Sequence, residues 1–269
     1  MEVLQHILNR ILIMRTITIR TKLNFLNSCK YLHNIKNIQI NNCVSYHKIK
    51  TSATLHYFTN IWLSDFKSKY LLPQHVTKIV FSNKFNKYLS IIPPTVKKIR
   101  FGARFNTIIR NCIPNSVTSI TFGMDFNQDI FATIPNSVTH IRFGQSFNLP
   151  VTALSSTLIT HLTFGSDFNQ PILNCIPITT THLTFGHNFN QDISTLPNSI
   201  THLTFGYSFN KPITNCIPTS VTHLTFGYCF NHPITNSIPK SVTHLSFSWT
   251  YEQYTERCAP KTVRHLFFV

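Results

Sequence analysis

The chain has 269 residues, of which 42% are hydrophobic and only 12% charged, and its formal net charge is +16. This length and apolar content allow a sizeable buried core, which excludes the intrinsically disordered class. No run of 18 apolar residues occurs, which excludes a membrane-spanning helix of ordinary length.

The first 34 residues are predicted to form two short helices. Apolar residues recur there at i, i+3 and i+4 spacing: Val3, Leu4, Ile7 and Leu8 in the first stretch, and Leu23, Leu26 and Cys29 in the second. The spelling E-V-L-x-x-I-L followed by L-x-F-L-x-x-C-K-x-L resembles an F-box, the module that docks on the Skp-type adaptor of cullin-RING ubiquitin ligases. The resemblance implies that Leu4, Ile7, Leu8 and Leu26 contact the adaptor, although the usual Leu-Pro before the first helix is missing. Alternatively, the same helices only cap the open end of a repeat array.

Residues 35–70 carry two stretches that fit the leucine-rich-repeat pattern L-x-x-L-x-L-x-x-N/C. These stretches begin at Ile35 and at Phe58, and their apolar residues keep the spacing of that pattern. We interpret them as degenerate coils that start a solenoid.

Residues 71–269 repeat one phrase at intervals of 20 or 21 residues. Its anchor is a Phe that occurs ten times: Phe81, Phe101, Phe122, Phe143, Phe164, Phe185, Phe205, Phe226, Phe247 and Phe268. A second Phe follows four residues after each of the first eight anchors, so 18 of the 23 Phe occupy two columns. All seven Gly directly follow an anchor. A fixed period of this length predicts stacked repeats.

Each unit reads approximately I-P-x-S-V-T-H-L-T-F-G-x-x-F-N-x-x-I. Apolar and polar residues alternate in V-T-H-L-T-F, which predicts a half-buried strand, and the Pro residues of the return path exclude a helix there. Stacked units would pair their strands in a parallel sheet and place both Phe columns in the core. The Asn after the second Phe is expected to satisfy backbone groups of the turn.

The recurring F-N and I-P pairs, as in FNKPITNCIPTSVTHLTFG, resemble the FNIP repeats of amoebae and the giant viruses that infect them, which are relatives of leucine-rich repeats. The likeness covers residues 71–269, with departures at Ser155 and Ser156 and in the last turn, where looser coils are expected. It implies protein binding without a reaction. The predicted fold is mainly β: a leucine-rich-repeat-like solenoid of about 12 coils, with a parallel sheet on one face and extended, Pro-containing returns. Short helices in 1–34 and degenerate coils in 35–70 precede it.

Two columns are candidates for partner binding. Three residues before the anchor, every unit from the fourth onward has His: His140, His161, His182, His202, His223, His244 and His265. Strand periodicity puts this column on the open face of the sheet, where a straight file of rings diverges and does not converge on a metal ion. Two residues after the anchor, the chain becomes aromatic toward its C-terminus, at Tyr207, Tyr228 and Trp249. Capping of the last coils is the alternative role of these three rings.

Positive charge is concentrated at the N-terminal end. Residues 1–110 contain 18 of the 24 Lys and Arg but only two of the eight acidic residues. The strand pattern puts Lys98 and Arg100 on the exposed face. Such a region attracts nucleic acid, anionic membrane or acidic protein, although no recognised motif for reading DNA or RNA accompanies it.

The chain contains no recognised enzyme motif, so neither catalysis nor a cofactor or metal is expected. Two functions fit: a substrate receptor for a cullin-RING ubiquitin ligase, docked through the F-box-like helices, or a stand-alone interaction scaffold. Nucleic-acid binding by the basic part is a third. The odd count of seven Cys and a start without a basic signal-peptide region favour an intracellular, cytoplasmic address, in the host cell if the chain is viral.

Overall fold

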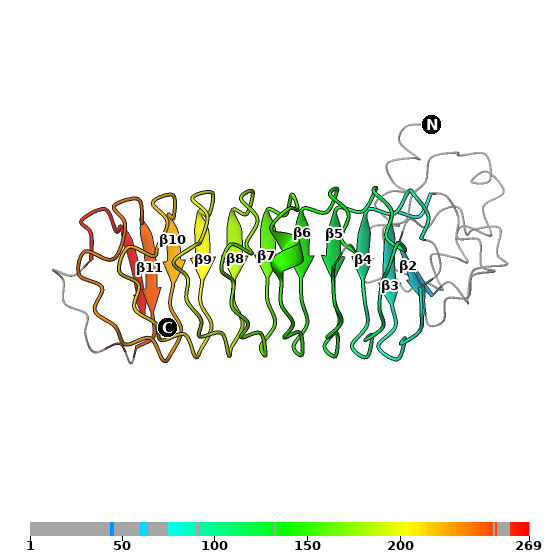
Figure 1. The fold of residues 1–269 in the computed structure, drawn as a ribbon, viewed down its shortest axis with the longest axis horizontal. Coiled ribbons are helices and arrows are strands. Elements are labelled where there is room, and N and C mark those ends of the chain that lie inside the picture. The colour runs from blue at the N-terminus through cyan, green and yellow to red at the C-terminus, as the bar shows by residue number, and fades with distance from the viewer. Residues whose placement is uncertain are drawn as a thin grey trace, which may run out of the picture.

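The computed structural model describes residues 44–45, 60–63, 75–89, 92–131, 133–249, 251 and 259–268. These residues wind into a solenoid in which each coil adds one short strand to a single sheet (Figure 1). The strands are β1 (Val44–Ser45), β2 (Asn60–Leu63), β3 (Lys78–Phe81), β4 (Lys98–Arg100), β5 (Ser119–Thr121), β6 (His140–Arg142), β7 (His161–Thr163), β8 (His182–Thr184), β9 (His202–Thr204), β10 (His223–Thr225), β11 (His244–Phe247) and β12 (His265–Phe268). Each strand pairs in parallel with the next one in sequence.

The predicted leucine-rich-repeat-like solenoid with a parallel sheet is confirmed. The sheet has 12 strands. Strands β3 to β11 follow the regular repeat and form about nine turns, and the expected count of about 12 coils also included the degenerate coils that contribute β1 and β2 and the last coil with β12. Strands β1 and β2 extend the sheet through shorter coils, in which Val44 pairs with Ile61 and Ile61 with Ile79. The helices predicted in residues 1–34 lie outside the described residues, and the division of the chain at 34 and 70 stays a prediction.

One coil departs from the regular form. It has Ser155 and Ser156 in place of I-P, and it contains the 3₁₀ turn η3 (Thr152–Leu154), the one helical segment in the described part of the chain. Leu154 in this turn is buried. The altered sequence therefore changes the return path while an apolar residue still fills the core.

The core consists of two Phe columns packed against each other. Within a coil, the two ring centroids lie 3.8 to 4.6 Å apart. The anchors from Phe81 to Phe247 and the second rings from Phe85 to Phe230 are all buried. The tenth anchor is an exception. Phe268 was expected in the core but is 47% exposed, because β12 lies at the edge of the described sheet and only the coil of β11 packs against it.

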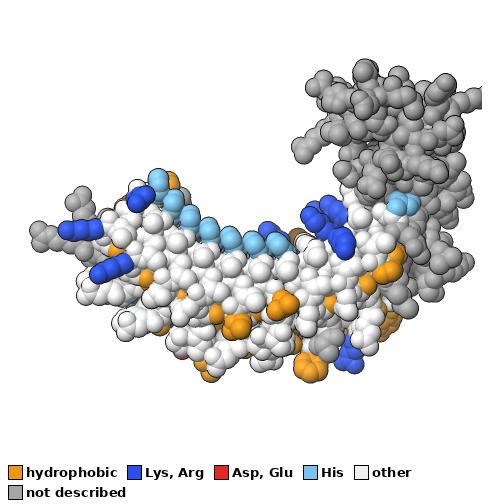
Figure 2. Space-filling model, turned by 90° about the horizontal axis from the view of Figure 1, so that it is seen from above, with side chains coloured by type: hydrophobic (Ala, Val, Ile, Leu, Met, Phe, Trp, Pro, Cys, Tyr) orange, Lys and Arg blue, Asp and Glu red, His pale blue; other side chains and the backbone are white. Residues whose placement is uncertain are grey.

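Ring spacing between coils grows with depth below the sheet. Neighbouring His rings on the open face are 4.1 to 4.3 Å apart, anchor Phe rings 5.2 to 5.8 Å, and second Phe rings 6.0 to 6.2 Å. The coils therefore fan apart toward their returns. The solenoid bends into an arc whose hollow side carries the His residues (Figure 2).

The Asn residues form a hydrogen-bonded ladder along the turns, as expected. The backbone N–H of each Asn from Asn106 to Asn231 donates to the Oδ1 atom of the Asn one coil earlier, at 2.9 to 3.0 Å. The side chain thus accepts a backbone donor that no strand satisfies, which explains a polar residue beside a core ring.

The Gly column is required by close packing between coils. A Cβ atom built on Gly165 would lie 1.6 Å from the carbonyl oxygen of Gly144, and the other six Gly show the same conflict with the preceding coil. No Gly has a positive φ, so turn conformation is not the reason for this residue type. Left-handed backbone occurs instead at Asn111, Asn174, Asn215 and Asn236.

We predict that Gly165→Ala destabilises the solenoid. The new methyl group must push two backbones apart, which costs about 2 kcal/mol or more. Thermal and urea unfolding followed by circular dichroism measure the loss, with Ser166→Ala at the next position as the control. Equal midpoints for the two variants would contradict a packing role for the Gly column.

Candidate functional site

The hollow side of the arc is formed by the first and third residues of strands β3 to β12, which we call the concave face. The first residues are Lys78, Lys98, Ser119 and then His140, His161, His182, His202, His223, His244 and His265. The third residues are Val80, Arg100, Thr121, Arg142, Thr163, Thr184, Thr204, Thr225, Ser246 and Phe267. These two rows contain no Asp or Glu. The concave face is therefore basic at β3 to β6 and rich in His from β6 onward (Figure 2).

The predicted His column is present as a continuous stack of rings. Each of the seven rings lies nearly parallel to the next, with interplanar angles of 9° to 18°. The rings are half-buried along most of the column, and His140 and His265 at its ends are exposed. The expected position on the open face is confirmed, and a role in partner binding remains a prediction.

A Thr residue directly before each His from His140 to His244 holds the His ring in place. The Oγ1 atom of Thr139 lies 2.8 Å from Nδ1 of His140, and the pairs through Thr243 and His244 repeat this contact at 2.9 to 3.0 Å. The same hydroxyl donates to the carbonyl of the Thr one coil earlier, as Thr160 does to Thr139 at 3.1 Å. Sequence reasoning missed this function of the repeated T-H dipeptide, although the repetition itself was the signal.

The stacked geometry disfavours charge on the His rings. Partial burial lowers the pKa of His182 and His202 below the ordinary value of 6.5, and the positive charge of neighbouring His rings lowers both further. The pKa of His140 is lowered by the same two causes in the same order, with a smaller contribution from Lys98. Proton binding at one ring therefore opposes proton binding at the next.

The aromatic residues expected at the C-terminal end form a second, separate row. His187 stacks on Tyr207 at 4.6 Å, Tyr207 on Tyr228 at 4.9 Å, and Trp249 meets Tyr228 edge-on. Tyr207 and Tyr228 are each 44% exposed and Trp249 is 73% exposed. These residues follow the strands, so the Gly column separates them from the His column. The structure thus places the predicted site residues in two parallel rows.

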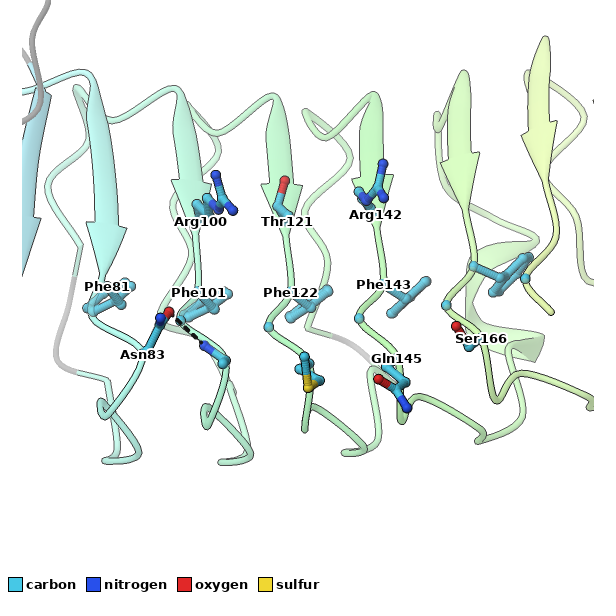
Figure 3. A pocket seen from close by; sticks show the side chains of 18 of the residues that line it. Phe81, Asn83, Arg100, Phe101, Thr121, Phe122, Arg142, Phe143, Gln145 and Ser166 are labelled. Carbon is cyan, nitrogen blue, oxygen red and sulfur yellow. Dashed lines mark hydrogen bonds between the residues drawn. The ribbon is translucent and has the colours of Figure 1, made fainter. Parts of the chain in front are cut away.

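A groove that sequence reasoning did not find lies at the N-terminal end of the sheet, along the third strand positions and the residues that follow the Gly column. It has a volume of about 550 Å³ and crosses the coils from β3 to β8. Figure 3 shows Arg100, Thr121 and Arg142 on one side, and Asn83 and Gln145 on the other. Gly102, Gly123, Gly144, Gly165 and Gly186 also line it. Neither bordering column is unusual by itself, and only their packing across the Gly column creates the hollow.

Three further findings concern the described residues alone. They contain no group of three or more His, Cys, Asp or Glu that is arranged to hold a metal ion. None of the helices in this part of the chain has the length and hydropathy needed to span a bilayer. The proposed adaptor contacts Leu4, Ile7, Leu8 and Leu26 lie outside this part of the chain.

The repeats match the family model described as "FNIP Repeat" at residues 69–104, 105–146, 157–188, 189–229 and 230–269. The chain belongs to the FNIP-repeat family. Among solved structures, it resembles "CroV588 a novel circular LRR protein structure", with a TM-score of 0.68 and 38% sequence identity. The likeness covers 79% of this FNIP-repeat chain and 37% of that protein's chain. No curated protein shows significant similarity.

We predict staggered titration along the His column. Because the pKa values of His182 and His202 are lowered by folding, the unfolded chain takes up protons first as the pH falls below about 6.5. The associated stability is present above that pH and is lost as the pH falls toward the folded pKa values. NMR titration should give midpoints below 6.5 for both rings.

The variant His182→Gln tests the electrostatic part of this prediction. It removes one charge that opposes protonation of His202, so the pKa of His202 should rise toward its ordinary value. His232→Gln is the control, since His232 lies outside the column. Seven independent titrations with one common midpoint would exclude coupling between the rings.

Proposed function

We propose that this chain is a protein-binding receptor that holds a target on its concave face. The observation that carries the proposal is the division of roles within each repeat. Phe, Leu and Ile fill the core, Gly and Asn set the contacts between coils, and the side chains of the concave face take no part in core packing. Solenoid repeats use extended concave surfaces of this kind for binding, which also favours a scaffold over an enzyme.

A test of this proposal is to place bulk on the concave face. In the double variant Thr184→Arg and Thr225→Arg, Arg enters the third strand position, which already holds Arg in β4 and β6 and therefore tolerates it. We expect the amount of partner protein labelled by proximity in cells to fall about tenfold, which corresponds to a loss of about 1.4 kcal/mol in binding free energy.

The matched control is Leu173→Arg with Ile178→Arg. These two side chains are 63% and 80% exposed on the return path, so the control adds the same charge away from the concave face. Equal loss of partners from both double variants, with unchanged melting temperatures, would argue against binding through the concave face.

We further propose that the target is presented to a cullin-RING ubiquitin ligase through the F-box-like residues 1–34. The F-box-like sequence pattern of residues 2–8 and 23–32 is the observation that favours this role over a stand-alone scaffold. In such an assembly the chain would act by proximity and carry out no chemistry of its own.

Affinity capture of the full chain from host cells tests the link to the ligase. Adaptor and cullin should be recovered, and Leu4→Asp with Ile7→Asp should abolish their recovery because the apolar helix face is lost. Gln5→Asp, off that face, is the control. If the adaptor is absent while partners of the concave face are captured, the stand-alone scaffold is the correct function. Nucleic-acid binding would appear as capture of nucleic acid that weakens steeply with rising salt concentration.

We also propose an intracellular, cytoplasmic address. Cys112, Cys175 and Cys216 are free thiols that occupy equivalent turns, and each donates to a carbonyl two residues earlier. Burial raises the pKa of all three thiols. Unreactive thiols with a structural role are typical of a reducing compartment.

A further inference from the structure

We propose that the groove between Arg100, Arg142 and the Gly column binds an extended acidic segment of the target, with carboxylates three residues apart in a polyproline II conformation. This inference rests on the proposed function, since it names the chemistry of the partner. The groove runs along the basic end of the concave face, with Arg100, Thr121 and Arg142 on one side and Asn83 and Gln145 on the other (Figure 3).

The charge of the groove is uncompensated. Its lining includes Arg100 and Arg142 but no Asp or Glu, and both side chains are exposed. Among the described residues, no carboxylate forms an ion pair with either of them. Lys98 occupies the first position of the strand that carries Arg100. Guanidinium groups bind carboxylates through paired, charge-assisted hydrogen bonds, so an acidic partner fits this site.

The shape of the groove selects an extended chain. The Gly residues that line it cannot acquire a Cβ, because each would collide with the carbonyl of the preceding coil. The hollow is therefore a fixed consequence of coil packing. It crosses the coils along the long axis of the solenoid. Its lining comes from residues of the four strands β3 to β6 and from residues that follow the strands up to Gly186. A hollow that runs across successive coils in this way fits a segment of extended chain.

The spacing of the two Arg residues favours a particular conformation. Arg100 and Arg142 belong to β4 and β6, with Thr121 of β5 between them. Two strand spacings give a separation of roughly 9 to 10 Å. Three residues of polyproline II rise about 9.3 Å and return to the same face. A fully extended strand returns to the same face after about 6.7 Å, which misses the second Arg.

The aromatic row argues for polypeptide over single-stranded nucleic acid. The bases of single-stranded nucleic acids bind proteins by stacking on the open faces of aromatic side chains. Tyr207 has a neighbouring ring stacked on each face, at 4.6 and 4.9 Å, and neither Tyr207 nor Tyr228 lines the groove. The Phe rings along the groove are buried, Phe101 being only 2% exposed. Arg side chains and backbone groups therefore remain as the binding elements.

Fluorescence anisotropy with the full chain tests the inference. The labelled peptide PEPPEPPEP should bind, and PQPPQPPQP, which keeps the conformation without the charge, should bind at least about tenfold more weakly. PPEEEPPPP has the same charge in one block and should also bind more weakly, because only one of its carboxylates can face an Arg. Arg100→Gln with Arg142→Gln should reduce affinity for PEPPEPPEP by about tenfold or more, since each lost contact is charge-assisted.

Two further variants separate the groove from general positive charge. Lys211→Gln with Lys240→Gln removes the same charge from exposed turns outside the groove and should leave affinity within about twofold. Ser166→Tyr leaves the charge unchanged but narrows the groove, and the fold tolerates Tyr at this repeat position in Tyr207 and Tyr228. It should weaken binding about tenfold, an effect that a diffuse electrostatic contact would not show.

Several outcomes would overturn the inference. Equal affinity for the Glu and Gln peptides excludes an acidic segment, and equal loss in the two charge variants excludes the groove. Tighter binding of a labelled oligo-dT of the same charge than of PEPPEPPEP assigns the groove to nucleic acid. If the groove variants fail these tests while Thr184→Arg with Thr225→Arg still abolishes partner labelling, the inference falls and the proposed function stands. If neither concave-face nor groove variants change partner labelling, the proposed function falls as well.

Discussion

Direct contact between the backbones of successive coils sets the pitch of this solenoid. Each Gly lies so close to the backbone carbonyl of the preceding coil, that of Ser82 for Gly102 and that of a Gly for the other six, that no room is left for a Cβ atom. Such contact fixes the register of the neighbouring strands, and the buried Phe rings then stack at regular intervals. The Asn ladder runs along the following turn and satisfies the N–H groups that this close approach leaves outside the sheet. The regular spacing of the concave face is therefore a product of packing within the repeat.

The curvature of the arc follows from the same arrangement. Coils are held close at the sheet, while the bulky second Phe column spaces them 6.0 to 6.2 Å apart deeper in the core. The concave face is compressed as a result, and its His rings stack at 4.1 to 4.3 Å. In this column, partial burial and the positive charges of neighbouring His rings lower the pKa values of His182 and His202. Core packing thus governs the electrostatics of a surface that the core does not touch.

Most of the fold could be predicted from the sequence because each repeated column has one dominant physical role. Alternation in V-T-H-L-T-F gave the strand, the two Phe columns gave the core, and the Asn column gave the turn contacts. The Gly column was recognisable as a pattern, but its reason was not, since a turn and a close approach both select Gly. The groove beside Arg100 and Arg142 was not predictable, because it depends on columns that are distant in the phrase and adjacent only after the coils stack. The predicted contacts of residues 1–34 lie outside the described residues.

The two ends of the concave face differ in the kind of positive charge they carry. Lys78, Lys98, Arg100 and Arg142 occupy β3 to β6, whereas the first position from β6 onward holds His. Within the His row, partial burial and neighbouring positive charges lower the pKa values of His140, His182 and His202. His140 and Arg142 share β6, where these two regions meet, and the charge of Lys98 helps to keep His140 neutral. The concave face is thus asymmetric along the axis of the solenoid, with Lys and Arg side chains from β3 to β6 and His side chains from β6 to β12.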